Sequence, residues 1–350
     1  MFNFVKILLS PLVIVYSTIM NMRNYLFNNG YFPIRRVNAK VISIGNLTVG
    51  GSGKTPAVIY TAKMLRDKGK KIGVLSRGYR RKSRGYLLVA DNTEIKTSVD
   101  KCGDEIFLTA GECRVPCAVA ERRVSGARKF LHDIDLDTIV LDDAFQHRWI
   151  HRDLNILMFD QRFVKISGRL EQKLLPLGYM REPYSEIERA DIVIINRKFS
   201  EKTGIPPKVK KYFEGKPTYY AYYKTTGFYD VKDHQFFPVE DFLGQKSLVI
   251  CGVAQPHSFI KILQQNKIDI KNRLMFPDHK NYSVKEVQLI RKRFYDTNSY
   301  SVITTQKDAV KLNYYAKELD DIDIYYLKIE LEIEDKEDFE NLLINKVYKK

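Results

Sequence analysis

Cysteine is scarce in this sequence and follows no metal-binding pattern. The 350 residues contain four cysteines, without paired C-x-x-C spacing and without the histidines that follow such pairs in zinc sites. The four are Cys102, Cys113, Cys117 and Cys251. We therefore expect free thiols in a protein that works in a reducing compartment.

An apolar run long enough to cross a membrane is also missing at the N-terminus. Between Lys6 and Arg23 lie 16 uncharged residues, ILLSPLVIVYSTIMNM, which two serines, a proline and a threonine interrupt. A spanning helix needs about 20 apolar residues. No A-x-A-like cleavage site follows, which disfavours a secretory signal. The segment is therefore expected neither to span a bilayer nor to be removed.

The same segment has the pattern of an amphipathic helix. Asn3, Ser10, Ser17 and Asn24 recur every seven residues, so a helix would carry them as one narrow polar stripe opposite a broad apolar face. This shape suits a helix that lies in the membrane interface, and we predict one over residues 1–29. The alternative is a helix docked on the protein's own core.

Negative charge is in short supply. The chain has 58 lysines and arginines against 42 aspartates and glutamates, a formal net charge of +16. Such an excess indicates an acidic partner, which is a nucleic acid, an anionic membrane surface or a phosphorylated substrate. No aromatic-basic recognition motif accompanies the charge, so we do not expect nucleic acid to be the partner.

A glycine-rich stretch, NLTVGGSGKTP at residues 46–56, resembles a phosphate-binding loop, although Thr48 stands where the pattern G-x-x-x-x-G-K-[ST] has its first glycine. Its surroundings favour a nucleotide site, because AKVISIGNL before it predicts a buried strand and PAVIYTAKMLRDKGK after it predicts a helix. An ordinary glycine-rich turn is the alternative. The expected ATP-binding residues are Gly50, Gly51, Ser52, Gly53, Lys54 and Thr55.

A second motif, TIVLDDAFQH, ends an apolar run with Asp142 and Asp143. Two carboxylates at a strand end fit an Mg²⁺ site beside the Thr55 hydroxyl, and phosphoryl transfer requires a metal there. A helix cap is the alternative for the acidic pair. His147 follows at a spacing that suits a donor to the transferred group, or a structural role.

Three further segments contribute candidate residues. RGYRRKSRG, which includes Arg77, follows the next predicted strand and is either a solvated basic face or a contact for an anionic substrate or lipid headgroup. A kinase also needs a group that accepts the proton of its substrate hydroxyl. Asp104 and His279 are candidates for a pair that accepts this proton. The alternatives are that Asp104 caps a helix and that His279 is an ordinary loop residue.

Strand and helix signals alternate to the C-terminus, with no internal repeat and no low-complexity linker. This alternation predicts an α/β protein: a P-loop NTPase-like domain with a parallel sheet and a second, smaller α/β domain. The stretch RLEQKLLPLGYMREP breaks the pattern, so we place the domains at residues 30–175 and 176–350. The closing strand and helix can belong to either.

Taken in order, NLTVGGSGKTP, SRGYRRKSRGY, GDE, LDDAFQHR, REP, FPDHKNYS and TTQKDAVKL resemble the tetraacyldisaccharide 4'-kinase family, the lipid A 4'-kinases of Gram-negative bacteria. The resemblance implies that ATP phosphorylates the 4'-hydroxyl of an acylated disaccharide 1-phosphate. It also implies a peripheral or monotopic protein on the cytoplasmic face of the inner membrane. The family's loop, NLTVGGTGKTP, lacks the first glycine too, and Ser52 replaces its threonine.

The resemblance further implies residue roles. Lys54 would contact the phosphates, Thr55 with Asp142 and Asp143 would organise Mg²⁺, and His147 would lie near the transferred group. Asp104 would act as base with support from His279. The nucleotide or substrate would be contacted by Tyr79 in RGY and by Arg181 and Glu182 in REP.

The chain departs from the family pattern in its second half. GVAQP replaces a GIGNP-like turn, and Gln306 replaces the glutamate of TEKDAVK. A GTPase switch is disfavoured because neither NRKF at Asn196 nor TQKD at Thr305 matches the guanine-binding N-K-x-D pattern. The alternative that stays open is a nucleotide-gated switch at the membrane surface without lipid kinase activity.

Overall fold

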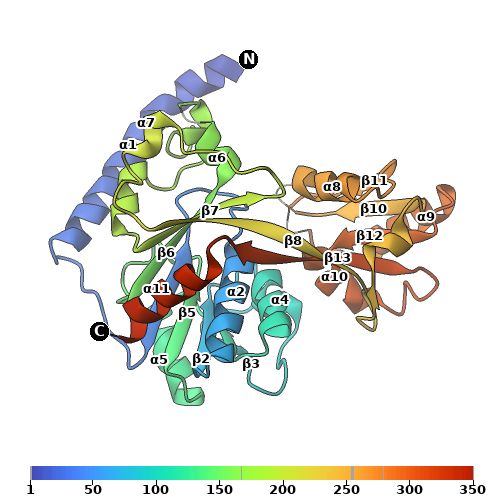
Figure 1. The fold of residues 1–350 in the computed structure, drawn as a ribbon, viewed down its shortest axis with the longest axis horizontal. Coiled ribbons are helices and arrows are strands. Elements are labelled where there is room, and N and C mark those ends of the chain that lie inside the picture. Colours follow the sequence, from blue (N-terminus) through green and yellow to red (C-terminus); the bar gives the residue numbers. More distant parts are fainter. Residues whose placement is uncertain (1, 167, 254–255, 279, 350) are drawn as a thin grey trace.

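The computed structural model shows a fold built on one large mixed β-sheet. The structure describes residues 2–166, 168–253, 256–278 and 280–349. Within them the sheet has 13 strands in the order β11-β10-β12-β13-β8-β7-β6-β1-β5-β2-β4-β3, with β9 paired to β8 (Figure 1). Most neighbours are parallel, which confirms the predicted α/β class. The strands are β1 (Lys40–Gly45), β2 (Ile72–Ser76), β3 (Leu87–Ala90), β4 (Cys117–Val119), β5 (Thr138–Asp142), β6 (Leu154–Asp160), β7 (Ile192–Lys198), β8 (Thr218–Asp230), β9 (Phe236–Phe237), β10 (Ser247–Cys251), β11 (Asn272–Met275), β12 (Ser301–Thr305) and β13 (Ile324–Ile333).

Helices cover both faces of the first half of the sheet, here called the first lobe (β1 to β7 with α2 to α6). This explains why its central strands are almost continuously apolar. Along β1, Ile42 packs with α2, α4 and α11 on one face, whereas Val41 packs with α5 on the other. The helices are α1 (Phe2–Asn28), α2 (Lys54–Asp67), α3 (Val99–Cys102), α4 (Asp104–Cys113), α5 (Arg123–Asp133), α6 (Gln161–Lys165), α7 (Pro207–Lys210), α8 (Pro256–Gln265), α9 (Val284–Asp296), α10 (Gln306–Leu312) and α11 (Lys336–Tyr348).

Two long strands connect this half to a second lobe, which consists of β10 to β12 with α8, α9 and α10. β8 and β13 run antiparallel side by side from one lobe to the other (Figure 1). After β13 the chain returns, and α11 packs Phe339 and Leu343 into the core of the first lobe. The two lobes share one continuous sheet, which marks no boundary between domains. The domain boundary near residue 175 therefore stays a prediction.

Helix α1 lies on the surface of the first lobe, and Asn24 of the predicted polar stripe faces inward. The buried Asn24 amide donates to Glu182 Oε1 at 3.2 Å, and the Tyr16 hydroxyl donates to the Arg181 carbonyl at 2.9 Å. On the opposite side Leu12, Ile19 and Met22 are 51%, 60% and 59% exposed. None of the described helices combines the length and the apolar character needed to cross a bilayer. The membrane association of α1 stays a prediction.

Candidate active site

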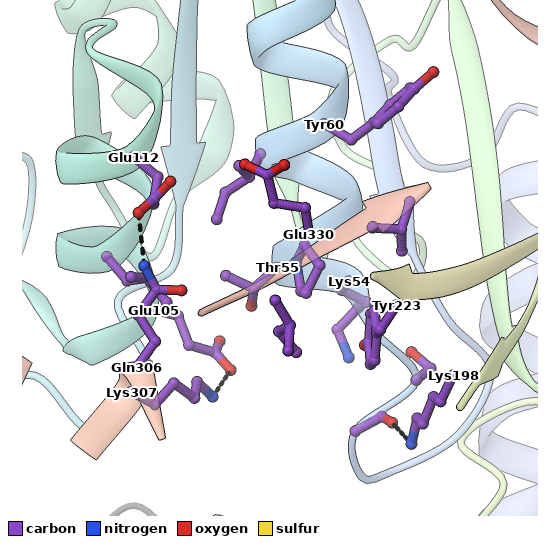
Figure 2. Close-up of a pocket in the computed structure, with 18 of the residues that line it drawn as sticks. Lys54, Thr55, Tyr60, Glu105, Glu112, Lys198, Tyr223, Gln306, Lys307 and Glu330 are labelled. Atoms are coloured by element: carbon purple, nitrogen blue, oxygen red, sulfur yellow. Dashed lines mark hydrogen bonds and ion pairs between the residues drawn. The ribbon is translucent and has the colours of Figure 1, made fainter. Parts of the chain in front are cut away.

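The glycine-rich loop and the acidic pair meet because the strands that precede them are parallel neighbours. Ile44 in β1 pairs with Asp142 in β5, so both chains leave the sheet at the same edge. There they border a cavity of about 980 Å³ between the two lobes. Its walls include all six predicted ATP-binding residues from Gly50 to Thr55, together with Asp143, Arg181 and Tyr79. Figure 2 shows Lys54 and Thr55 among the residues that line it.

Glycines are needed in this loop at particular positions, and Thr48 is not one of them. Gly50 and Gly53 have φ values of +102° and +96°, which side chains rarely adopt. A Cβ at Gly53 would also lie 2.2 Å from Asn196 Nδ2. Thr48 has no positive φ, and its hydroxyl accepts a hydrogen bond from Asn46 at 3.4 Å. The missing first glycine therefore leaves the loop geometry intact.

Asp143 is held between two cations at the cavity wall. Its Oδ1 lies 3.7 Å from Lys54 Nζ, and Arg181 donates from one nitrogen to both carboxylate oxygens at 3.0 and 3.1 Å. Desolvation would raise the pKa of Asp143, but the charges of Lys54 and then Arg181 lower it. Asp143 is therefore ionised at neutral pH.

Asp142 is buried beneath the loop and is only partly hydrogen-bonded. Ser76 Oγ donates to its Oδ2 at 3.1 Å, while its Oδ1 has no hydrogen-bond partner among the described residues. Burial, followed by the negative charges of Glu105 and Asp143, raises the pKa of Asp142 to about 7. A buried carboxylate oxygen without a donor fits a nearby cation.

The residues present suit Mg²⁺ held jointly with phosphates rather than by protein alone. The described residues contain no group of three or more histidine, cysteine, aspartate and glutamate side chains that would hold a metal ion. Mg²⁺ usually takes one or two carboxylates and completes its shell with phosphates and water. Asp142, Asp143 and the buried Thr55 form a donor set of that kind. Their metal role stays a prediction.

Asp104 lies beside the main cavity rather than in its wall. It is buried as the first residue of α4, with Oδ2 3.5 Å from Lys311 Nζ. Both residues border a separate cavity of about 30 Å³, and Tyr79 borders both cavities. His279 lies outside the described residues, although its neighbour Asp278 lines the main cavity. The pairing of Asp104 with His279 stays a prediction.

His147 and Arg77 do not line the main cavity. Burial, followed by the charges of Arg123 and Arg152, lowers the pKa of His147 to about 4. Its imidazole is therefore neutral at pH 7, with one N–H to donate. Arg77 is exposed at the end of the strand β2.

Glu182 is fully buried away from the cavity and binds several surrounding groups. Its Oε2 accepts from Gln146 at 3.1 Å and from Arg189 at 2.7 Å, and its Oε1 accepts from Asn24 of α1. These contacts tie α1 to the REP segment. A direct contact with substrate, as the sequence predicts for Glu182, therefore stays a prediction.

Sequence analysis missed the residues that cross the cavity from α10. Lys307 Nζ lies 2.6 Å from Glu105 Oε1, and Gln306 Nε2 donates to Glu112 Oε1 at 2.6 Å (Figure 2). It also missed Lys198 at the end of β7, which contacts the glycine-rich loop. Each of these contacts joins positions more than 140 residues apart. The sequence motifs GDE, NRKF and TTQKDAVK contain Glu105, Lys198, Gln306 and Lys307, but no pattern in them indicated these contacts.

Comparison with known proteins identifies the family. The sequence profile of tetraacyldisaccharide-1-P 4'-kinases matches residues 5–348. The tetraacyldisaccharide 4'-kinase of Aquifex aeolicus is 34% identical over 329 residues, covering 94% of this chain and 95% of that protein. The enzyme of Phocaeicola vulgatus is 36% identical over 327 residues, covering 89% and 86%.

A solved structure agrees with the sequence match. The crystal structure described as the "apo" form of LpxK from Aquifex aeolicus in complex with ATP superimposes with a TM-score of 0.82 at 32% identity. It covers 98% of this chain and 100% of that one. The chain belongs to the tetraacyldisaccharide-1-P 4'-kinase family.

Proposed function

We propose that this protein, a kinase by its family, transfers the γ-phosphoryl group of ATP to the 4'-hydroxyl of a tetraacyldisaccharide 1-phosphate, a lipid A precursor. The observation that carries the proposal is the family match over residues 5–348, together with an intact phosphate-binding loop at the cavity between the lobes. The solved relative is in complex with ATP, which supports ATP as the donor.

The transfer is proposed to be a single in-line step. Lys54 and the amides of the loop neutralise charge on the γ-phosphoryl group, and the cavity between the lobes excludes water. Thr55, Asp142 and Asp143 are the residues that would hold Mg²⁺, which when bound neutralises further charge on the phosphates. No covalent enzyme intermediate is required.

Asp104 is proposed to accept the proton of the sugar hydroxyl, with His279 in support. Because Tyr79 borders both cavities, the hydroxyl would approach Asp104 past this tyrosine. His147, neutral at pH 7 and outside the wall of the main cavity, would act near the transferred group through the residues that line it. The proposed substrate region also includes Arg77, Arg181 and Glu182. Because Glu182 is buried, it would act by holding the REP segment in place.

The lipid substrate requires access from a membrane surface. We propose that α1 lies in the interface on the cytoplasmic face of the inner membrane, because its outward face carries Leu12, Ile19 and Met22. The net charge of +16 would add attraction to anionic lipid. We do not propose nucleic acid as a binding partner.

The first experiment follows the γ-phosphate of labelled ATP with Mg²⁺ and tetraacyldisaccharide 1-phosphate in mixed micelles. We expect labelled bisphosphorylated lipid from the intact chain and a loss of roughly 10²-fold or more in kcat from Lys54→Ala. Lys71→Ala is the matched control, because Lys71 is exposed and pairs with Asp135 away from the cavity. Label that appears only as inorganic phosphate would favour the nucleotide-gated membrane switch.

A further inference from the structure

The end of β7 holds the phosphate-binding loop from behind. Lys198 Nζ donates to the Gly51 carbonyl at 2.8 Å (Figure 2). The same nitrogen contacts Asp160 Oδ2 at 2.6 Å. Two residues earlier, Asn196 Nδ2 donates to the Ser52 carbonyl at 3.3 Å. Two consecutive loop carbonyls are therefore bound by side chains from one strand end. These residues belong to NRKF, the segment that does not match a guanine-binding pattern.

Binding these carbonyls orients the loop amides. A trans peptide group is planar, so its N–H points opposite to its carbonyl. With the Ser52 carbonyl held against Asn196, the Gly53 amide is turned away from β7. The Ser52 amide of the Gly51 peptide group donates to the Gly50 carbonyl at 3.1 Å, so Lys198, on the Gly51 carbonyl, fixes a tight turn inside the loop. Both effects favour a loop whose N–H groups are arranged for an anion before it binds.

The local structure of β7 serves this contact. Lys198 has φ +56°, an uncommon conformation for a residue with a side chain, and the pairing of β7 with β8 shifts register between Asn196 and Lys198. The side chains of Lys198 and Asp160 are each 9% exposed. A buried ion pair is weak support for stability, because desolvation offsets the attraction. Stability therefore does not explain why the Lys198–Asp160 ion pair lies against the phosphate-binding loop.

We propose that Lys198 is a positioning residue that, with Asn196, arranges the phosphate-binding loop for the β- and γ-phosphates of the nucleotide. Asp160 aligns the lysine, since the adjacent strand β6 ends at this carboxylate. The proposal rests on the proposed function for the identity of the nucleotide. It concerns nucleotide binding, which is measured without the lipid acceptor.

The test measures binding of ATP and of AMP to Lys198→Met with Mg²⁺ present, by competition against a fluorescent ATP analogue. We expect ATP affinity to fall about tenfold or more, the loss of one positioned charged donor, and AMP affinity to change less than about twofold. In turnover assays the KM for ATP should rise while the KM for the lipid stays unchanged. Equal losses for ATP and AMP, or unchanged ATP affinity, would overturn the proposal.

Lys202→Met is the matched control, because this lysine lies in the following segment, is 54% exposed and pairs with Glu334. It should bind both nucleotides as the intact chain does. Should Lys198→Met fail to fold, Asn196→Ala removes the second carbonyl contact and leaves the ion pair in place. A selective loss of ATP affinity in Asn196→Ala would support the proposal, and unchanged affinity would overturn it. Failure of lipid phosphorylation with normal ATP binding would count against the proposed function alone.

Discussion

At the scale of single residues, the buried Asp142 is expected to make the stability of the chain depend on pH. Its raised pKa means that the folded chain binds a proton more readily than the unfolded chain. The stabilising contribution is thus fully present below the ordinary aspartate pKa and is lost as pH rises to about 7. Above that pH the charged carboxylate is available to a metal, at a cost in stability.

We therefore predict that the Mg²⁺ concentration needed for half-maximal activity falls as pH rises to about 7, because Mg²⁺ competes with the proton on Asp142, and that Asp142→Asn is inactive throughout. At pH 8 Asp142 is charged, so the variant, which removes this buried charge, should unfold at a higher temperature than the intact chain. At pH 4 Asp142 is already neutral, so the two should unfold at the same temperature. Thermal unfolding without nucleotide at both pH values measures this. An increase of equal size at pH 4 would contradict it.

At the level of residues, the sequence predicted which side chains lie together where one short motif contains them, while their roles stay predictions. Lys54 and Thr55 line the cavity beside the loop, and Asp143 reaches the same wall from the neighbouring strand. Lys198 and Glu105 were not predicted, because each depends on a partner far away in the sequence. No local spacing distinguishes Lys198 from any other lysine after a strand.

At the scale of elements, sequence periodicity predicted the helix α1 but not which of its sides faces the protein. The seven-residue spacing of Ser17 and Asn24 predicted a helix with a polar stripe, and the structure has that helix with Asn24 buried against the first lobe. Periodicity cannot state which side of a helix faces the protein. Here polar partners such as Glu182 select the polar side, which leaves the apolar side outward.

We predict that Leu12→Glu combined with Ile19→Glu abolishes co-sedimentation with anionic vesicles, because both side chains lie on the exposed face. Phosphorylation of micellar substrate should fall through a higher lipid KM, while the affinity for ATP is unchanged. Leu12→Ile with Ile19→Leu is the control that keeps the apolar face. Full vesicle binding by the glutamate variant would refute an interfacial role for α1.

At the scale of the whole molecule, distant segments define the cavity. Sequence patterns predicted the alternating strands, but they did not indicate that β8 and β13 pair antiparallel and make one sheet of both lobes. Tyr325 pairs with Asp230 and Ile333 with Ala221, roughly a hundred residues away in each case. Pairing over such separations depends on tertiary packing, which local propensity does not contain.

Glu112 lies where four of these segments converge. Its carboxylate lies 3.1 Å from Lys63 of α2 and 3.0 Å from Lys328 of β13, and it accepts from Gln306 of α10. We call these four residues the Glu112 junction. An amide at 306 suits this position, since the glutamate of the family motif would meet Glu112 as a like charge. The junction thus links the first lobe to the second across the cavity.

We predict that Glu112→Gln lowers the unfolding free energy by about 1–3 kcal/mol at pH 7, because two lysines lose a largely buried anionic acceptor. Burial would raise the pKa of Glu112, but Lys328 and Lys63 lower it, so its contribution holds above the ordinary glutamate pKa and is lost as pH falls below it. The difference in thermal unfolding between variant and intact chain should accordingly shrink in acid. Glu94→Gln, at an exposed glutamate paired with Lys96, should show no comparable loss at pH 7. A pH-independent difference for Glu112→Gln would mean that shape, and not charge, holds the lobes together at this point.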